Sequence, residues 1–226
     1  MEECYFGKGG IGFLKRNPMI LTLILFLAGV NFVASAFDAT LPAYVLSNPN
    51  GGEVVLGIVS SSAGIATLIG SVVATLLPKP RNRIRVIYLT MLFSLSVENF
   101  VLAFARVPVL WCLAQIIGWS VVPIMSTNLD VILRSSIPVE MQGRVYSCRN
   151  TLQYFTIPFG LLMGGALVDK VCEPLMERTL SGGILQTLFG ASKGSGAAMV
   201  MFILGVLGTV VCLLFGSILE KYKYNE

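Results

Sequence analysis

Six long apolar stretches take up most of this 226-residue chain, and each is close to or above the roughly 20 residues that a helix needs to cross a bilayer. Charged residues make up 12% of the sequence, against about 25% in soluble domains. A backbone in lipid must satisfy its own hydrogen bonds, and these stretches are too long for barrel strands. The sequence therefore predicts an all-α membrane protein with six transmembrane helices, at residues 19–46, 55–77, 84–105, 107–133, 149–168 and 197–218.

Basic residues are distributed unevenly between the two sides of such a bundle. Twelve of the 16 Lys and Arg residues fall in the tails and in the links on the same side as the tails, and four fall on the other side. Because basic segments stay in the cytoplasm, we expect both termini there. Residues 1–18 and 219–226 are then cytoplasmic tails around a domain at 19–218, and 169–196 is an outer loop. A signal-peptidase site at Ala34–Ala36 is the weaker alternative, because the apolar run continues to Leu46.

Several kinds of chemistry are excluded by residue types. The chain has no histidine, and its five cysteines form no Cys-x-x-Cys pair. A His-based catalytic group, a zinc site and a disulfide framework are therefore not expected. No Ser/His arrangement or Gly-rich phosphate loop is present either, so we expect no enzyme, no cofactor, no metal site and no nucleic-acid partner.

Small residues form stripes on two of the predicted helices. In lipid, helices approach closely where small side chains meet, so both stripes are predicted to pack against other helices. An additional interpretation is that such smooth faces let helices slide during gating. The stripes consist of Gly57, Ser60, Gly64, Thr67 and Ser71 on the second helix, and Gly160, Gly164 and Gly165 on the fifth.

Several motifs resemble one family of transporters. The segment Pro138–Ser147 reads Pro-Val-Glu-Met-Gln-Gly-Arg-Val-Tyr-Ser, and it follows Asn128–Arg134 and precedes Gly164–Asp169. These segments resemble the C-terminal half of bacterial major facilitator superfamily transporters, in the branch of macrolide-efflux-like and enterobactin-exporter-like proteins. The link at 77–85 keeps the basic residues of that family's loop but lacks its Asp.

The resemblance implies that the six spans correspond to helices seven to twelve of a twelve-helix transporter. The fold implied is half of a major facilitator fold, built from two inverted three-helix repeats. The function implied is proton-coupled efflux of a small amphipathic substrate by alternating access. The partners implied, besides membrane lipid, are the missing N-terminal six-helix half or a second copy of this chain. The alternative is a non-transporting membrane subunit or truncated fragment that associates with a partner half.

Polar residues within the spans are the candidate site. Asn31 and Asp38 lie two helical turns apart, and by resemblance they line the central cavity; the alternative for Asp38 is a bond near the outer interface. Asn128 and Gln153 are further candidates for substrate or coupling contacts, or plain interhelical hydrogen bonders. Glu98 is expected to make an interfacial or interhelical bond.

Charged residues near the predicted cytoplasmic end are candidates for a gate. Asp130 and Arg134 are four residues apart and are expected to pair on one helix face. With Arg144 they surround the link between the fourth and fifth helices, which favours a cytoplasmic gate. The alternative is a plain ion pair at a helix end.

Overall fold

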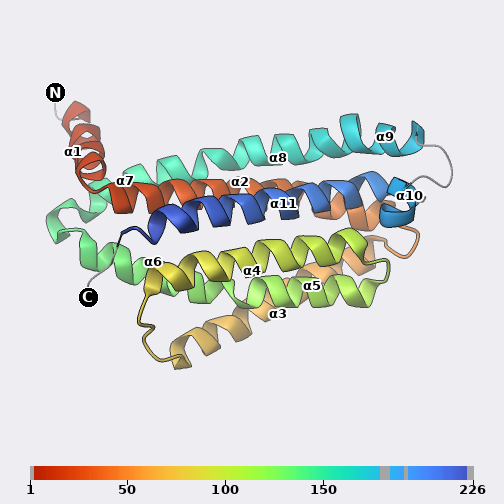
Figure 1. The fold of residues 1–226 in the computed structure, drawn as a ribbon, viewed down its shortest axis with the longest axis horizontal. Helices are drawn as coiled ribbons and strands as arrows, with labels where there is room; N and C mark the ends of the chain where they lie inside the picture. The colour runs from red at the N-terminus through yellow and green to blue at the C-terminus, as the bar shows by residue number, and fades with distance from the viewer. Residues whose placement is uncertain (1–2, 179–183, 191–192, 223–226) are drawn as a thin grey trace.

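The computed structural model describes residues 3–178, 184–190 and 193–222, and these are almost entirely helical (Figure 1). No strand occurs in these ranges. The helices are α1 (Glu3–Arg16), α2 (Pro18–Ser47), α3 (Glu53–Leu76), α4 (Arg83–Phe104), α5 (Pro108–Ser120), α6 (Val122–Ser136), α7 (Val139–Tyr154), α8 (Thr156–Ala166), the π-helical segment η1 (Leu167–Cys172), α9 (Glu173–Arg178), α10 (Ile184–Phe189) and α11 (Ser195–Leu219).

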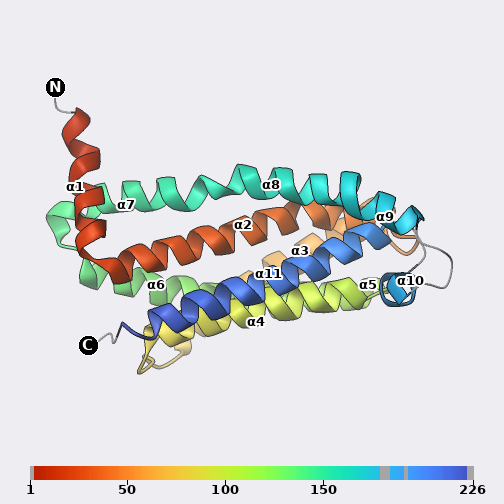
Figure 2. The same ribbon diagram turned by 45° about the horizontal axis from the view of Figure 1, so that its top comes forward.

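Six helical segments of the described chain are long and apolar enough to cross a membrane, in agreement with the all-α prediction. They run along the long axis of the molecule, and both chain ends lie at the same end of it (Figures 1 and 2). Helix α1 stands across this axis at that end, where the sequence suggested a tail. The fifth span is longer than expected at both ends, because residues 139–148 and 169–178 are helical and extend it to Val139–Arg178.

Two of the spans are broken near a proline. Helix α5 ends at Ser120 and α6 begins at Val122, with Pro123 in its first turn. In the same way α7 ends at Tyr154 and α8 begins at Thr156, with Pro158 in its first turn. A proline cannot donate a hydrogen bond to the preceding turn, so the helix is interrupted just before it. The interruption lies at Val121, two residues before Pro123 where the sequence predicted a kink, and Val121 keeps right-handed helical angles, so Pro108–Ser136 remains one span.

The core forms where α2 and α4 meet α11, and α8 packs along the other side of α2. Gly160 and Gly164 of α8 lie directly against the α2 backbone, where an added Cβ would collide with Phe32 and Ala36. Gly165, the third member of the predicted stripe, has no such neighbour within 4 Å. Close approach of α8 to α2 therefore depends on two of the three glycines, and it gains dispersion contact that lipid alone does not provide.

The stripe on α3 does not pack as the sequence predicted. Gly57, Ser60, Gly64 and Ser71 are exposed, Thr67 is half-buried, and nothing lies within 4 Å of a Cβ added at either glycine. The residues that α3 buries are Val59, Ala66 and Gly70, about 100° further around the helix. Gly70 sits against the backbone of Ser120, so the contact with α5 uses this second seam. The described chain therefore leaves the small-residue stripe uncovered.

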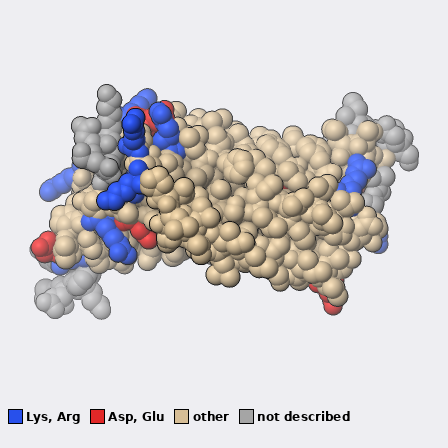
Figure 3. Space-filling view, turned by 90° about the horizontal axis from the view of Figure 1, so that it is seen from below, with Lys and Arg blue, Asp and Glu red and all other residues tan. Residues whose placement is uncertain are grey.

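On the face shown in Figure 3, charges gather at the two ends of the molecule and leave a broad belt almost without charged side chains between them. Most of the Lys and Arg side chains in this view lie at the end where the chain termini are, as the uneven sequence distribution suggested. At this end Glu220 accepts hydrogen bonds from Tyr88 Oη (2.6 Å) and Arg85 Nε (3.0 Å). These bonds lower the pKa of the exposed Glu220 carboxyl below its ordinary value of 4.5.

Candidate functional site

An open groove runs beside Asp38 on the outside of the bundle. Asp38 of α2 is exposed, although it lies nine residues, about 14 Å of helix, before α2 ends. The groove has a volume of about 310 Å³, and the uncovered stripe of α3 forms one wall of it. Its lining residues are Phe37, Asp38, Leu41, Ser60, Ala63, Gly64, Thr67, Gln115 and Trp119. The small residues of α3 thus leave space next to a carboxylate.

A second, more enclosed cavity of about 200 Å³ lies behind this groove, between α2, α4, α5 and α6. Glu98 and Asn99 of α4 line it, and their exposed fractions are only 5% and 1%. Glu98 Oε1 and Asn99 Oδ1 have no hydrogen-bond partner among the described residues. Gly118 of α5 lies directly against the Glu98 carboxyl, and a Cβ there would collide with Oε2. The sequence predicted an interfacial or an interhelical bond for Glu98, and its burial between helices does not fit the interfacial alternative.

Two aromatic side chains separate the groove from the cavity, because Phe37 and Trp119 line both. Asn31 lines the inner cavity and Asp38 the outer groove, so the two residues that the sequence placed on one face lie in different spaces. Asn31 Nδ2 donates to the backbone carbonyl of Gln153 (3.3 Å) and ties α2 to α7. Gln115 Nε2, at the groove, is buried without a partner in the described chain.

Asn128 takes part in the link between α4 and α6 at the basic end. Its Oδ1 accepts a 3.0 Å hydrogen bond from Arg83 Nη1, and both side chains are buried. They line a cavity of about 500 Å³ under the link at 77–83, together with Lys79, Thr127 and Val131. Asn128 is therefore an interhelical hydrogen bonder, one of the two roles that the sequence left open.

The charges proposed as a gate form a different pair from the one expected. Asp130 of α6 lies 3.9 Å from Arg149 of α7, not in an ion pair with Arg134, which is exposed. Arg149 also donates to Gln153 Oε1 (3.2 Å) and stacks over the Tyr146 ring. Arg144 lies one turn earlier on α7, and Gly10 of α1 packs against its backbone carbonyl. Sequence spacing did not predict the pairing of Asp130 with Arg149, because helix spacing shows neighbours within a helix, whereas this pair joins two helices.

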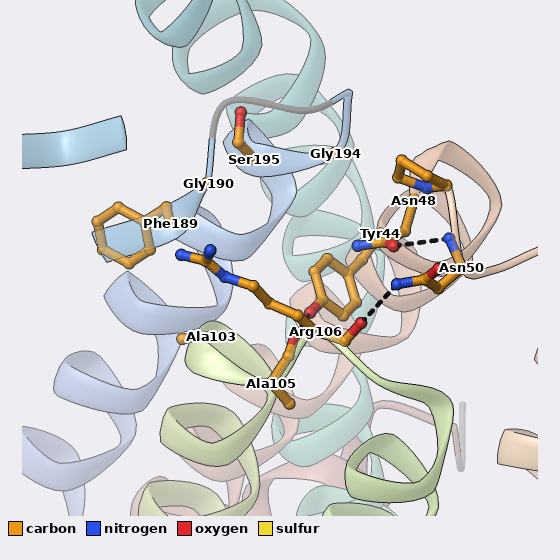
Figure 4. A pocket seen from close by; sticks show the side chains of 11 residues that line it. Tyr44, Asn48, Asn50, Ala103, Ala105, Arg106, Phe189, Gly190, Gly194 and Ser195 are labelled. Carbon is orange, nitrogen blue, oxygen red and sulfur yellow. Dashed lines mark hydrogen bonds between the residues drawn. The ribbon is translucent and has the colours of Figure 1, made fainter. Parts of the chain in front are cut away.

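The opposite end of the bundle is closed by contacts between links. Figure 4 shows the cavity there, about 260 Å³, with the Arg106 side chain directed toward Phe189. Arg106 donates to the carbonyl of Thr187 (3.1 Å), and Asn50 Nδ2 donates to the carbonyl of Arg106 (3.0 Å). Nearby, the Glu173 carboxylate accepts bonds from the backbone N–H groups of Gly194 and Gly196. A carboxylate at the start of α11 stabilises the unpaired N–H groups there, so these polar groups are engaged in holding the links together.

The described residues contain no group of His, Cys, Asp and Glu side chains placed to hold a metal ion. The chain is similar to the multidrug efflux pump Tap of Mycolicibacterium fortuitum, with 26% identity over 162 residues. These residues are 71% of this chain and 39% of that protein, so the chain matches about two fifths of the relative's length. No family model matches the sequence, and no solved structure matches it.

Proposed function

We propose that this chain is one half of a secondary transporter, with the architecture of half a major facilitator fold, which exports a small amphipathic molecule in exchange for protons. Six apolar helices and similarity to an efflux pump support a membrane transporter rather than an enzyme. The observation that carries the proposal further is the exposed Asp38 carboxylate, together with the groove beside it.

Asp38 is badly placed for contact with lipid. A charged side chain at the centre of a spanning helix costs about 2.5–3.5 kcal/mol on insertion scales, so such residues face a water-filled cavity or another protein segment. The Ser60, Gly64 and Thr67 wall of the groove is also more polar and smoother than a lipid-facing surface. We therefore infer that this face is covered by a second six-helix unit, and that substrate and protons pass between the two.

The second unit is either an N-terminal half or a second copy of this chain. In transporters of this kind, substrate and coupling ions bind near the midplane where the repeats meet, and six helices form two inverted repeats of three. The end with most basic residues faces the cytoplasm under this proposal, in a bacterial cytoplasmic membrane. The Asp130–Arg149 pair, with Arg134 and Arg144 beside it, then lies where a cytoplasmic gate between α6 and α7 would open.

The experiment is dye efflux from membrane vesicles that contain the chain. A pH gradient should drive transport of a lipophilic cationic dye, and a protonophore should abolish it. Asp38→Asn should reduce the rate to that of vesicles without the chain. Glu53→Gln removes an exposed carboxylate at the start of α3, away from the groove, and should leave the rate unchanged.

Protein amounts in the vesicles must be matched, because either variant could act through insertion. If the inserted wild-type chain gives no more flux than empty vesicles, with or without a co-expressed partner half, the chain is a non-transporting subunit and the proposal is wrong. Equal flux from wild type and Asp38→Asn would show that Asp38 is not part of the transport pathway.

A further inference from the structure

We propose that Glu98, Asn99 and the cavity that they line form a buried proton-binding site, which exchanges protons with the Asp38 groove past Trp119. Its part in coupling rests on the proposed transport function, whereas proton binding by Glu98 does not. The inference starts from two buried oxygen atoms, Glu98 Oε1 and Asn99 Oδ1, which lack partners in the described chain and line one cavity.

An ionised Glu98 would be poorly stabilised where the side chain lies. Burying an unpaired carboxylate carries a penalty of several kcal/mol, whereas a protonated carboxyl is neutral and supplies an O–H donor. That donor is what both orphaned oxygens lack, because a carboxylate oxygen and an amide oxygen only accept. Gly118 packs directly against the carboxyl and restricts its movement away from the cavity.

No cation from the surrounding helices is placed to neutralise Glu98. Helices α5 and α11 contain no Asp, Glu, Lys or Arg, and their only thiols are Cys112 and Cys212. Helix α2 contributes one charged residue, Asp38, whose carboxylate repels a negative charge on Glu98. On α6 the charged residues are Asp130 and Arg134, near its far end, and Asp130 is paired with Arg149. These charges favour a state in which the carboxyls of Glu98 and Asp38 together hold one proton.

The route between the two carboxyls passes the aromatic pair Phe37 and Trp119. The inner cavity has a mostly apolar lining, but Asn31, Ser94, Glu98 and Asn99 also line it and offer polar groups to water. It is large enough for several water molecules, which occupy about 30 Å³ each in the liquid. The Trp119 side chain lines both spaces and lies within hydrogen-bonding reach of the Glu98 carboxyl. In the exchange step the Asp38 carboxyl releases its proton and the Glu98 carboxylate accepts it through water, so the total charge is unchanged. Rotation of the Trp119 side chain would open and close this path.

The test is carbodiimide labelling of the complete chain in its membrane, read by mass spectrometry of the peptide that contains Glu98. N,N′-dicyclohexylcarbodiimide reacts with protonated carboxyls in apolar surroundings. The carboxyl oxygen bonds to the carbodiimide carbon, the proton moves to nitrogen, and an acyl shift gives a stable N-acylurea. We expect Glu98 to be labelled at neutral pH, where free Glu carboxyls, with a pKa of about 4.3, are ionised. Labelling should fall about tenfold for each pH unit beyond the midpoint of its titration.

Glu98→Gln should abolish this labelling, and Trp119→Ala should accelerate it by widening the route. Asp38→Asn should leave Glu98 labelled, since the site itself remains. A chain that is folded, as judged by a single symmetric peak in size-exclusion chromatography, but whose Glu98 is unreactive throughout the pH series would overturn the proposal. So would protection by sodium ions at constant pH, which would make the site a metal-cation site. If Glu98 labelling follows pH but the chain shows no dye efflux, the proton site is supported and the proposed transport function is wrong.

Discussion

The polar side chains on the two sides of α5 differ in their exposure. On one side, Glu98 and Asn99 are enclosed by four helices and have oxygen atoms without partners. On the other, Asp38 and the small residues of α3 are open to whatever lies outside the chain. Enclosure of an unpaired acid favours a bound proton, whereas exposure of a charge within a span indicates water or a second protein unit. The difference indicates that burial decides whether a carboxyl within a span holds a proton or faces water or a second protein unit.

The largest expected effect comes from comparing leucine substitutions at two glycines, one packed against another helix and one with open space around it. Gly164→Leu should destabilise the chain by about 3 kcal/mol, because the new side chain would collide with the α2 backbone at Ala36. Gly64→Leu should leave stability nearly unchanged, since nothing lies within 4 Å of its Cβ. It should nevertheless block dye efflux by filling the groove. Denaturant unfolding in detergent measures the first effect and vesicle flux the second.

Equal destabilisation by the two leucine variants would show that the α3 face is packed, contrary to the structure. Normal flux with Gly64→Leu would mean that the groove is not part of the transport pathway. Gly165→Leu serves as the control on α8, because this neighbouring glycine also has open space around it.

A smaller effect is expected at the basic end, where a mostly buried Arg149 meets a half-exposed Asp130. Arg149→Ala and Asp130→Asn should each lower stability by less than about 1 kcal/mol, since solvent screens the pair. The double variant should be no worse than the worse single one. Arg134→Ala should behave independently of Asp130→Asn, and a double-mutant cycle measures both couplings. Coupling of Asp130 to Arg134 instead of Arg149 would restore the pairing that the sequence suggested.

The smallest effect concerns Glu220, whose side chain is exposed at the basic end. Because its pKa in the folded chain lies below the ordinary value of 4.5, its bonds to Tyr88 and Arg85 stabilise the folded state above that pH. This contribution is lost as the pH falls through the folded-state pKa. Wild type should therefore unfold at a slightly higher temperature than Glu220→Gln at neutral pH. The difference should vanish in acid; a constant difference would mean that the carboxylate charge is not involved.

Sequence reasoning predicted the six spans well because length and apolar content alone decide whether a helix can cross a bilayer. It predicted less well which face of each helix is covered. Helix α3 carries two seams of small residues, and the chosen one, with Gly57 and Gly64, is open, while Gly70 on the other contacts α5. Hydropathy gives depth along a helix but not direction around it when every face is apolar.

The same limit explains why the sequence predicted the candidate site only in part. Asn31 and Asp38 share a helix face by spacing, but the ring of Phe37 separates the spaces that they line. Glu98 was judged from its place near the end of a span, and its burial depends on Gly118 of another helix. Contacts between helices such as Asp130–Arg149 leave no periodic signal in the sequence.

The most direct test of the account is the water accessibility of the groove. In a chain whose five native cysteines are replaced, Thr67→Cys and Leu68→Cys place a thiol on adjacent positions of α3. Thr67 lines the groove, while Leu68 is 71% exposed on the apolar surface. A charged, membrane-impermeant thiol reagent should label the Thr67 position in native membranes much faster than the Leu68 position, and a transported dye should slow it. Equal labelling of both positions, or faster labelling at Leu68, would contradict a water-filled pathway at Asp38.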